Sequence, residues 1–417
     1  MILLYHIKNL KIKRRIITTL AALHFFGNPS KKMKVVGVTG TNGKTTTATL
    51  LYRIATSLGH KAGLISTVEN IIVKEVRGAT HTTPDSVTLS KLLHEMAEKG
   101  CEYVFMEVSS HALDQNRVAG ITFAGGIFTN LTHDHLDYHK TMDRYFSAKK
   151  KFFDMLPESA FALSNADDDH GKKMLEGIKA RKFLYEFKNI DGPATLYDAF
   201  RGELISSHFS GLEIKLGDTI IKSWLLGKFN AYNLLTVWAA SNLLGFDMKK
   251  VNEILTTIEP PRGRFEHFIS PKGVLVIVDY AHTPDALEKV LLVARDLKQE
   301  GKKLISVFGC GGDRDPTKRA KMGSIGATLS DIAIFTSDNP RSEDPNKIIV
   351  QMKSDLLPGL IEKIKSIPNR REAIAESMKL AQSGDIILCA GKGHETYQEI
   401  KGVKNHFNDV EEFQKVF

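Results

Sequence analysis

The sequence of 417 residues predicts an α/β fold in two domains, each built around a mainly parallel sheet. Three observations lead to this expectation. An apolar run over residues 34–38 is followed by a glycine-rich turn and by a segment with helical spacing over residues 48–58. Apolar runs then alternate with helical segments as far as residue 258, and the same alternation begins again beyond Pro260 and Pro261.

The composition is that of an ordinary globular chain, with 42% hydrophobic and 8% aromatic residues. The 3 cysteines, Cys101, Cys310 and Cys389, lie far apart and fit no metal-binding spacing, which indicates a reducing compartment and predicts a cytoplasmic protein. The net charge of +9 suits a phosphate-bearing small molecule, because no nucleic-acid-binding motif accompanies it. No apolar run reaches the length of a transmembrane helix.

Residues 1–32 predict a lead-in helix that ends at Gly27, Asn28 and Pro29, because glycine followed by proline stops a helix. Lysines and arginines interrupt its apolar residues too often for the core of a signal peptide. The same pattern leaves open an amphipathic helix that lies on an anionic membrane surface.

The first full domain is expected over residues 33–258. Strands over residues 103–106 and 126–129, and a helix over Ser86–Glu98, continue the alternation of a parallel sheet with helices on both faces. Residues 181–225 carry short alternating runs and turn glycines, which predict a small antiparallel insertion.

Polar side chains follow two of these strands directly, namely Glu107 and Asn130. In a parallel sheet, ligands bind outside the carboxyl ends of the strands. We therefore expect both side chains to lie in one crevice with the glycine-rich turn.

Pro260 and Pro261 are incompatible with a helix interior at this point, and they mark the start of a second domain over residues 259–417. The elements expected beyond them are strands over residues 274–278, 304–308, 332–335 and 386–389, helices over residues 284–298 and 319–330, and two further helices before the last strand. This pattern predicts a Rossmann-like domain without a phosphate loop of its own.

The glycine-rich turn of the first domain has the residues of a phosphate loop (P-loop). Gly40 and Gly43 let backbone N–H groups point at an anion, Lys44 supplies a charge to the terminal phosphates, and Thr45 offers a hydroxyl to Mg²⁺. Val38 stands where the strict pattern has glycine, so an ordinary glycine-rich turn remains the alternative. The sequence thus predicts a P-loop domain that binds a magnesium nucleotide.

Further motifs follow along the chain, and the whole set reads, in order, GTNGKTTT, EVSSHAL, NLTHDHLDYH, DYAHTPDAL, GGDRD, TSDNPR and GKGHE. With these motifs the sequence resembles the Mur ligases from about Arg15 to the C-terminus, and within that family the ligases that add the third residue of the peptidoglycan stem peptide. The resemblance implies an ATP- and Mg²⁺-dependent enzyme that phosphorylates a carboxylate and then joins it to the amine of an amino acid.

The resemblance also assigns the catalytic residues. Lys44 would hold the β- and γ-phosphates, and Thr45 with Glu107 would hold one Mg²⁺. A second Mg²⁺ would be held by His135, Glu107 and a carbamylated Lys149, because a carbamate supplies the oxygen ligands that Mg²⁺ prefers. Two alternatives stay open, a charged helix face for Lys149 and a structural imidazole for His135.

The nucleotide-binding residues that the resemblance implies come from both domains, so ATP would lie between them and domain closure would protect an acyl phosphate from water. These residues are Gly40, Thr41, Asn42, Gly43, Lys44, Thr45, Thr46, Asn130, Asn233, Arg264, Asp279 and His282.

Two further sets would bind the substrates. The residues matched to a muramoyl dipeptide acceptor are Thr82, Thr83, Ser109, Gln115 and Arg117, and those matched to meso-diaminopimelate are Arg314, Asp338, Asn339, Arg341, Gly391 and Glu395. Arg341 would bind the distal carboxylate and repel the ammonium of lysine, and Glu395 suits the distal amine. The alternatives are plain polar surface for Gln115 and Arg117, and a helix cap or a surface pair with Glu343 for Arg341.

The sequence departs from the family before the P-loop. The family's enzymes carry an N-terminal domain that binds uridine diphosphate, whereas Gly40 lies near the start of this sequence. Three interpretations follow: a fragment; a ligase that accepts the same substrate weakly or with a partner that supplies the missing domain; or a ligase for an acceptor without UDP, such as a lipid-linked muramoyl peptide. Otherwise we expect a monomer with small-molecule substrates and no nucleic acid.

Two other functions remain as alternatives. A folylpolyglutamate-synthase-like ligase would share the architecture, but the DNPR and GKGHE motifs argue against it. A non-catalytic nucleotide-binding subunit would have no need of Lys44, Glu107, His135 and Lys149, which are all present.

Overall fold

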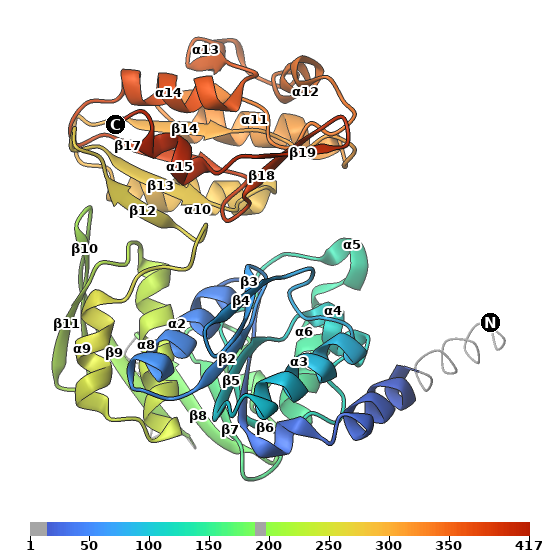
Figure 1. Ribbon diagram of the computed structural model, residues 1–417. Coiled ribbons are helices and arrows are strands. Elements are labelled where there is room, and N and C mark those ends of the chain that lie inside the picture. Colours follow the sequence, from blue (N-terminus) through green and yellow to red (C-terminus); the bar gives the residue numbers. More distant parts are fainter. Residues whose placement is uncertain (1–14, 188–196) are drawn as a thin grey trace. The chain divides into compact units, whose positions relative to one another are not determined.

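The computed structural model describes residues 15–187 and 197–417 (Figure 1). The chain forms two compact units, of which the first ends at Glu259 and the second comprises Pro260–Phe417 together with the short segment Ser207–Gly211. Ahead of the first sheet, a helix covers residues 15–25 and the 3-10 helix η1 covers Pro29–Lys32. The first fourteen residues of the expected lead-in helix lie outside the described residues.

The first unit is built on a sheet of 11 strands in the order β11-β10-β9-β8-β7-β6-β1-β5-β2-β3-β4. The strands are β1 (Lys34–Thr39), β2 (Ala62–Ile65), β3 (Glu69–Ile72), β4 (Glu75–Gly78), β5 (Tyr103–Glu107), β6 (Phe123–Phe128), β7 (Phe161–Asn165), β8 (Arg181–Glu186), β9 (Asp198–His208), β10 (Gly211–Leu216) and β11 (Thr219–Ser223). The helices are α2 (Lys44–Ser57), α3 (Ser86–Glu98), α4 (Ser110–Asp114), α5 (Leu136–His139), α6 (Met142–Asp154), α7 (Gly171–Met174), α8 (Lys228–Leu244) and α9 (Met248–Thr257).

The strands from β9 to β2 in this order pair in parallel, whereas β2 with β3, β3 with β4, and β10 with β11 pair antiparallel. The expectation of a separate antiparallel insertion over residues 181–225 was wrong in part. β8 and β9 continue the parallel sheet, and β10 and β11 form its antiparallel edge. Local alternation does not reveal this, because it is the same in an insertion and in the edge of a large sheet.

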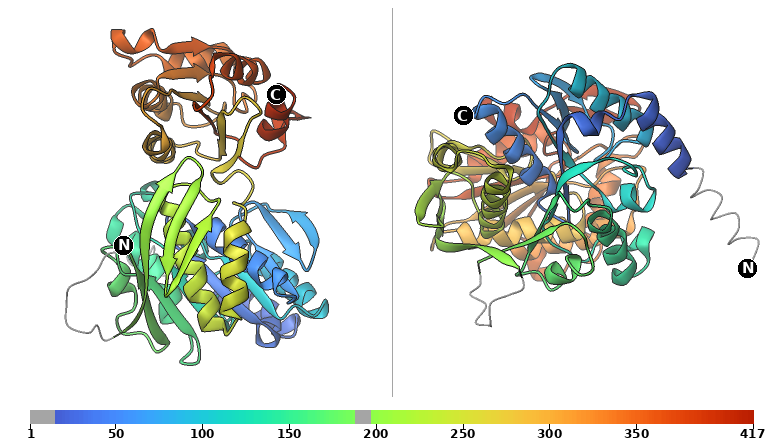
Figure 2. Two further views of the ribbon diagram at one scale, coloured as in Figure 1. Left: turned by 90° about the vertical axis from the view of Figure 1, so that its left-hand side faces the viewer. Right: turned by 90° about the horizontal axis from the view of Figure 1, so that it is seen from below.

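The core of the first unit lies on both faces of the sheet. Val36 and Val38 of β1 pack in a cluster with α2, α8 and α9, and Val35 packs in a second cluster with α3 and α6. Successive side chains of a strand point to opposite faces, so one apolar strand serves both clusters. α8 and α9 lie side by side on the first of these faces (Figure 2).

The second unit contains a sheet of 6 strands in the order β12-β13-β17-β14-β15-β16 and a two-stranded hairpin, β18-β19. Its strands are β12 (Glu266–Ile269), β13 (Leu275–Asp279), β14 (Leu304–Phe308), β15 (Ile332–Phe335), β16 (Ile364–Ser366), β17 (Ile386–Ala390), β18 (Tyr397–Ile400) and β19 (Val403–His406). Its helices are α10 (Pro284–Leu297), α11 (Thr317–Leu329), α12 (Pro345–Met352), α13 (Pro358–Ile361), α14 (Arg370–Leu380) and α15 (Asp409–Gln414). Only β12 runs antiparallel to its neighbour within the sheet of 6 strands.

The expected α/β architecture, with a mainly parallel sheet followed by a Rossmann-like one, is confirmed. Three helices, rather than the expected two, lie between β15 and β17, and the short strand β16 lies among them. Within the described residues, none of the helices combines the length and the apolar character needed to cross a bilayer.

Candidate active site

The P-loop lies between β1 and α2, and it requires glycine at two positions. Gly40 has φ 152°, and a Cβ there would lie 1.9 Å from the hydroxyl oxygen of Thr129. Gly43 has φ 85°, and a Cβ there would lie 2.7 Å from Oδ1 of Asn233. Both values of φ disfavour side chains, so these residues let the turn approach β6 and α8 closely.

Asn130 holds the P-loop in place. Its amide oxygen accepts a hydrogen bond from the backbone N–H of Asn42 at 3.0 Å, and its amide nitrogen donates to the carbonyl of Asn42 at 3.1 Å. The carbonyl of Asn130 accepts a further bond from the N–H of Thr41 at 2.8 Å. β6 lies next to β1 in the sheet, so the residue after one strand reaches the turn after the other.

The first turn of α2 is open to an anion. No side chain caps this helix and its first turn contains no acidic residue, whereas Asp85 caps α3 with hydrogen bonds from two backbone N–H groups. The Nζ of Lys44 donates to the carbonyls of Gly40 at 2.9 Å and Thr41 at 2.7 Å. An uncapped helix N-terminus beside a lysine is suited to a phosphate group.

Glu107 ends β5 beside the P-loop and is buried, with 1% of its surface exposed. Its Oε1 accepts hydrogen bonds from the hydroxyl of Thr45 at 2.8 Å and from the N–H of Thr67 at 2.7 Å. The hydroxyl of Thr67 donates to Oε2 at 3.2 Å. β1 pairs with β5 and β5 pairs with β2, which brings the residues that follow these three strands together.

This set of donors fits Mg²⁺. A hydroxyl and a carboxylate are hard oxygen ligands, and a protein Mg²⁺ site usually combines one or two carboxylates with water and substrate phosphates. Among the described residues, no group of three or more His, Cys, Asp or Glu side chains is placed to hold a metal ion. Thr45 and Glu107 could therefore hold Mg²⁺ only together with oxygens that the nucleotide supplies.

Lys149 of α6 lies under the P-loop and not on a solvated helix face, since only 1% of its surface is exposed. Its Nζ donates to the carbonyl of Gly40 at 2.7 Å and lies 4.5 Å from the ring centroid of Tyr145. Burial, and next the charge of Lys44, lower the pKa of Lys149 well below its ordinary value. The neutral amine is the form that can react with carbon dioxide.

His135 lies in a cluster of aromatic side chains beside α5. Its ring centroid is 4.9 Å from that of His111 and 6.0 Å from that of Tyr145, and its Nδ1 is 3.5 Å from Oδ1 of Asp134. Partial burial lowers the pKa of His135 below its ordinary value, which favours the neutral imidazole that can act as a ligand. The hydroxyl of Tyr145 lies 3.2 Å from that of Thr41, so Tyr145 joins this cluster to the P-loop.

The residues matched to the acceptor form a chain of hydrogen bonds that leads to Glu107. The hydroxyl of Thr83 donates to the carbonyl of Glu107 at 2.8 Å and accepts from the N–H of Ser109 at 3.0 Å. Arg117 donates to the carbonyl of Thr83 at 2.7 Å and also binds Oε1 of Gln115. Thr82 belongs to the same network, because its hydroxyl oxygen lies 3.0 Å from that of Thr67.

In the second unit, the residues matched to the nucleotide lie where β13 ends. The carboxylate of Asp279 accepts from the N–H groups of Phe265 and Ala281, each at 2.8 Å, while burial raises the pKa of Asp279. The guanidinium of Arg264 lies 5.0 Å from the ring centroid of Tyr280. Its buried Nε has no hydrogen-bond partner in the part of the chain that the structure describes. Buried polar groups are normally hydrogen-bonded, so this N–H is available to a ligand.

The imidazole of His282 contacts the backbone of the loop to which it belongs, since its Nδ1 lies 2.8 Å from the carbonyl oxygen of Tyr280. Burial lowers the pKa of His282. The carbonyl of Asp279 accepts from the N–H of Gly391 at 3.0 Å, which joins the loop after β13 to the loop after β17.

The residues matched to the amino acid gather in the loops that follow β14, β15 and β17. Arg341 donates through Nη1 to the carbonyl of Gly312 at 2.7 Å, and its Nε lies 3.5 Å from Oε2 of Glu399. The amide nitrogen of Asn339 donates to Oε2 of Glu395 at 2.8 Å. These strands are neighbours in a parallel sheet, so the loops after them meet at one edge.

Arg341 does not pair with Glu343, and that alternative was wrong. The carboxylate of Glu343 instead accepts two hydrogen bonds from Arg319, at 2.8 Å each, and one from the N–H of Asp313 at 2.6 Å. A Cβ added at Gly311 would lie 3.0 Å from Nη1 of Arg341 and 3.7 Å from Cγ of Arg314, so both arginines lie around this glycine.

Three residues of the site were missed by the sequence analysis. Thr67 follows β2 without a recognisable motif, and its contacts with Glu107 depend on strand order. Tyr145 lies on the same helix as Lys149, but nothing in the sequence shows that its hydroxyl reaches Thr41. Lys392 lies inside the GKGHE motif, but nothing in the sequence shows that this lysine is fully buried and bonded to Glu395 and Asn339.

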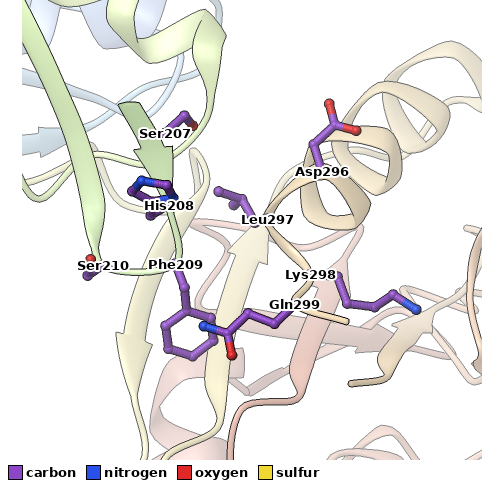
Figure 3. Close-up of a pocket in the computed structure, with 8 residues that line it drawn as sticks. All are labelled: Ser207, His208, Phe209, Ser210, Asp296, Leu297, Lys298 and Gln299. Atoms are coloured by element: carbon purple, nitrogen blue, oxygen red, sulfur yellow. The ribbon is translucent and has the colours of Figure 1, made fainter. Parts of the chain in front are cut away.

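A pocket lined by Ser207, His208, Phe209, Ser210, Asp296, Leu297, Lys298 and Gln299 is shown in Figure 3. It contains none of the candidate residues named above.

The fold and the site define a nucleotide-binding α/β protein with a P-loop unit and a Rossmann-like unit. Residues 38–241 match the Mur ligase middle domain, and residues 263–393 match the Mur ligase, glutamate ligase domain. The chain belongs to the Mur ligase family.

Similar proteins agree with this assignment. A protein of Cytophaga hutchinsonii named UDP-N-acetylmuramoyl-L-alanyl-D-glutamate--2,6-diaminopimelate ligase is 53% identical over 392 residues, which cover 94% of this chain and 79% of that protein. A solved structure of a ligase with the same name is 34% identical with TM-score 0.67, over 92% of this chain and 78% of that one. A folylpolyglutamate synthase from Thermotoga maritima is 16% identical with TM-score 0.68, over 93% and 94% of the two chains, and shows a shared fold alone.

Proposed function

We propose that this chain is an ATP-dependent ligase that joins the D-glutamyl carboxylate of a muramoyl-L-alanyl-D-glutamate acceptor to meso-diaminopimelate, in peptidoglycan synthesis in the cytoplasm. The observation that carries the proposal is the cluster of Arg341, Asn339 and Glu395 at the carboxyl edge of the second sheet. A guanidinium, an amide and a carboxylate suit the carboxylate and the ammonium at one end of a diamino dicarboxylic acid. The names of similar proteins agree with this substrate.

The first step would be a phosphoryl transfer. An oxygen of the acceptor carboxylate attacks the γ-phosphorus of ATP, the bond to the bridging oxygen breaks, and ADP leaves with its electron pair. The uncapped N-terminus of α2 and Lys44 are suited to hold the phosphates, for which Lys44 would exchange its present backbone partners. Mg²⁺, bound by Thr45 and Glu107, would neutralise charge on the phosphate oxygens.

In the second step, the amine of diaminopimelate attacks the acyl carbon, inorganic phosphate leaves with the electron pair of the bond that breaks, and the nitrogen gives up a proton as the amide forms. Thr83, Ser109 and Arg117 are linked by hydrogen bonds to the end of β5, and we propose that they bind the acceptor there. In the second unit, we propose Arg264, Asp279 and His282 as further nucleotide ligands, which the partnerless Nε of Arg264 supports within the described residues.

We also propose that Lys149 reacts with carbon dioxide to form a carbamate with release of a proton. The amine is buried, and its lowered pKa favours the neutral form that this reaction needs. The carbamate would present oxygen atoms beneath the P-loop, where hard ligands suit Mg²⁺. His135, with its lowered pKa, is proposed as a nitrogen ligand at the same place.

The experiment is a measurement of phosphate release with ATP, Mg²⁺ and the muramoyl dipeptide, both with and without UDP on the acceptor. The amino acids compared are meso-diaminopimelate, lysine, glutamate and none. We expect release to require both the acceptor and diaminopimelate, and the variant Lys44→Met to remove it. Preference for lysine would contradict the role of Arg341, and preference for glutamate with a folate acceptor would favour a folylpolyglutamate-synthase-like ligase.

A further inference from the structure

Lys392 occupies an unusual position beside the proposed amino-acid site. It follows β17, and 0% of its side chain is exposed. Lysine is almost never fully buried unless its charge is paired. The Nζ of Lys392 donates to Oε2 of Glu395 at 2.9 Å and to Oδ1 of Asn339 at 3.3 Å, and it lies 3.8 Å from Oδ1 of Asp338. All three partners belong to the set matched to the amino acid.

Lys392 and a backbone N–H together set which way the amide of Asn339 faces. Oδ1 of Asn339 accepts from Lys392 and also from the backbone N–H of Glu399 at 2.9 Å. A carbonyl oxygen has two lone pairs, so these donors use both. The amide nitrogen of Asn339 then faces away from these two donors. One of its N–H groups donates to Glu395 at 2.8 Å, and the other can donate to a ligand.

The contact with Glu395 decides which of its carboxylate oxygens meets a ligand. Lys392 and the amide of Asn339 both donate to Oε2. Neither of these two hydrogen bonds goes to Oε1 of Glu395. Oε1 is therefore the carboxylate oxygen that can accept a hydrogen bond from a substrate ammonium. Lys392 thus fixes one donor and one acceptor side by side, which is the pattern that an ammonium and a carboxylate on the same carbon atom require.

We propose that Lys392 is the residue that positions Asn339 and Glu395 for the distal end of a diamino dicarboxylic acid, and so determines the specificity of the ligase. This inference rests on the proposed function. Lys392 does not touch the substrate; it is a positioning residue that acts through the two side chains it holds. Its charge also balances the buried Asp338, whose pKa is raised by burial.

The distal end of the amino acid lies away from the amine that reacts. Interactions there are made equally in the ground state and in the transition state, so their loss raises KM and leaves kcat unchanged. A structural role alone would instead lower the melting temperature and affect all substrates together. The split between KM and kcat, and between diaminopimelate and ATP, separates the two roles.

The first test compares Lys392→Met with wild type and with Lys347→Met, which makes the same change on an exposed lysine of α12. We expect Lys392→Met to raise KM for meso-diaminopimelate at least about ten-fold, because Asn339 and Glu395 then lose their hydrogen bonds to the charged groups of the substrate. KM for ATP should stay within about two-fold of wild type. The control should match wild type. An unchanged KM for diaminopimelate, or an equal rise for ATP, would overturn the proposal.

The second test uses Lys392→Arg, which keeps the buried positive charge and so protects the fold if Lys392→Met is too unstable to purify. Arginine presents its donors in a flat fork, so it cannot reproduce both contacts of an ammonium group. We expect a raised KM for diaminopimelate with a normal KM for ATP. Wild-type behaviour of Lys392→Arg would show that charge balance alone is needed and would refute positioning.

Failure of the proposed function gives a different result. If wild-type protein releases no phosphate with diaminopimelate, the ligase assignment itself is wrong. If wild type is active and either Lys392 variant keeps its KM for diaminopimelate, the ligase assignment stands and only the inference about Lys392 fails.

Discussion

The pair formed by Arg370 and Asp409 allows a sharp prediction about what holds the second unit together. Both side chains have 0% exposure, and the guanidinium donates from Nε and Nη2 to the two carboxylate oxygens at 2.7 Å each. The same guanidinium donates to the carbonyls of Ser337 at 3.4 Å and Ala390 at 3.1 Å. These carbonyls directly precede Asp338 and Gly391, so the pair also fixes two loops of the proposed amino-acid site.

The variant Arg370→Met keeps much of the volume but leaves the carboxylate of Asp409 buried without its partner. Loss of one partner of a buried ion pair costs about 3–5 kcal/mol. For a unit of this size, each kcal/mol lowers the melting temperature by about 2–4 °C, so we expect a fall of roughly 6–20 °C. Hydrogen exchange measured on peptides of the second unit reports this loss separately from the first unit.

Arg371→Met is the matched control, because it makes the same change one residue further along. Arg371 is 58% exposed, and its partner Glu412 keeps a second contact with Lys415 at 2.8 Å. Glu412 itself is only 3% exposed, but its ion pair with Lys415 remains when Arg371 is replaced, so we expect a clearly smaller loss of stability than for Arg370→Met. The double variant Arg370→Met with Asp409→Leu should recover much of the stability, since no buried charge then remains. If Arg370→Met is as stable as Arg371→Met, the reasoning is refuted.

Three further predictions concern substrate choice, the carbamate and pH. Arg341→Met should lower kcat/KM for meso-diaminopimelate by about 10- to 100-fold without lowering that for lysine, because a charge-assisted bond to the distal carboxylate is lost. Phosphate release with each amino acid measures this, and an equal loss for both would contradict it. Lys149→Ala should abolish ligation, and wild type labelled with ¹³CO₂ should show a carbamate signal that the variant lacks; full activity of the variant argues against the carbamate. Arg319 lowers the pKa of Glu343 to about 2 from 4.5, so the stabilisation that this carboxylate gives is complete above pH 4.5 and is lost as the pH falls toward 2. Urea unfolding of wild type and Glu343→Gln should therefore differ more at about pH 7 than at about pH 3, and a difference independent of pH would contradict this assignment.

The sequence determined the parts of this protein that depend on neighbouring residues. The run from β1 through the P-loop into α2 is local, because Gly40 and Gly43 set the backbone of the turn and the residues after Lys44 form a helix. The alternation of apolar strands and helices likewise predicted two α/β units. The resemblance of ordered motifs to the Mur ligases supplied the family, which the comparisons confirm.

Only the tertiary structure decided which side chains meet. Thr67 reaches Glu107 because β2 lies beside β5, and Lys149 is buried because its helix packs beneath the P-loop. The lowered pKa of Lys149 and the contact of Lys392 with Asn339 follow from burial and from the meeting of segments far apart in the sequence. Hydrogen bonds between strands and the removal of water from a side chain depend on the whole fold, and local residue patterns do not encode them one by one.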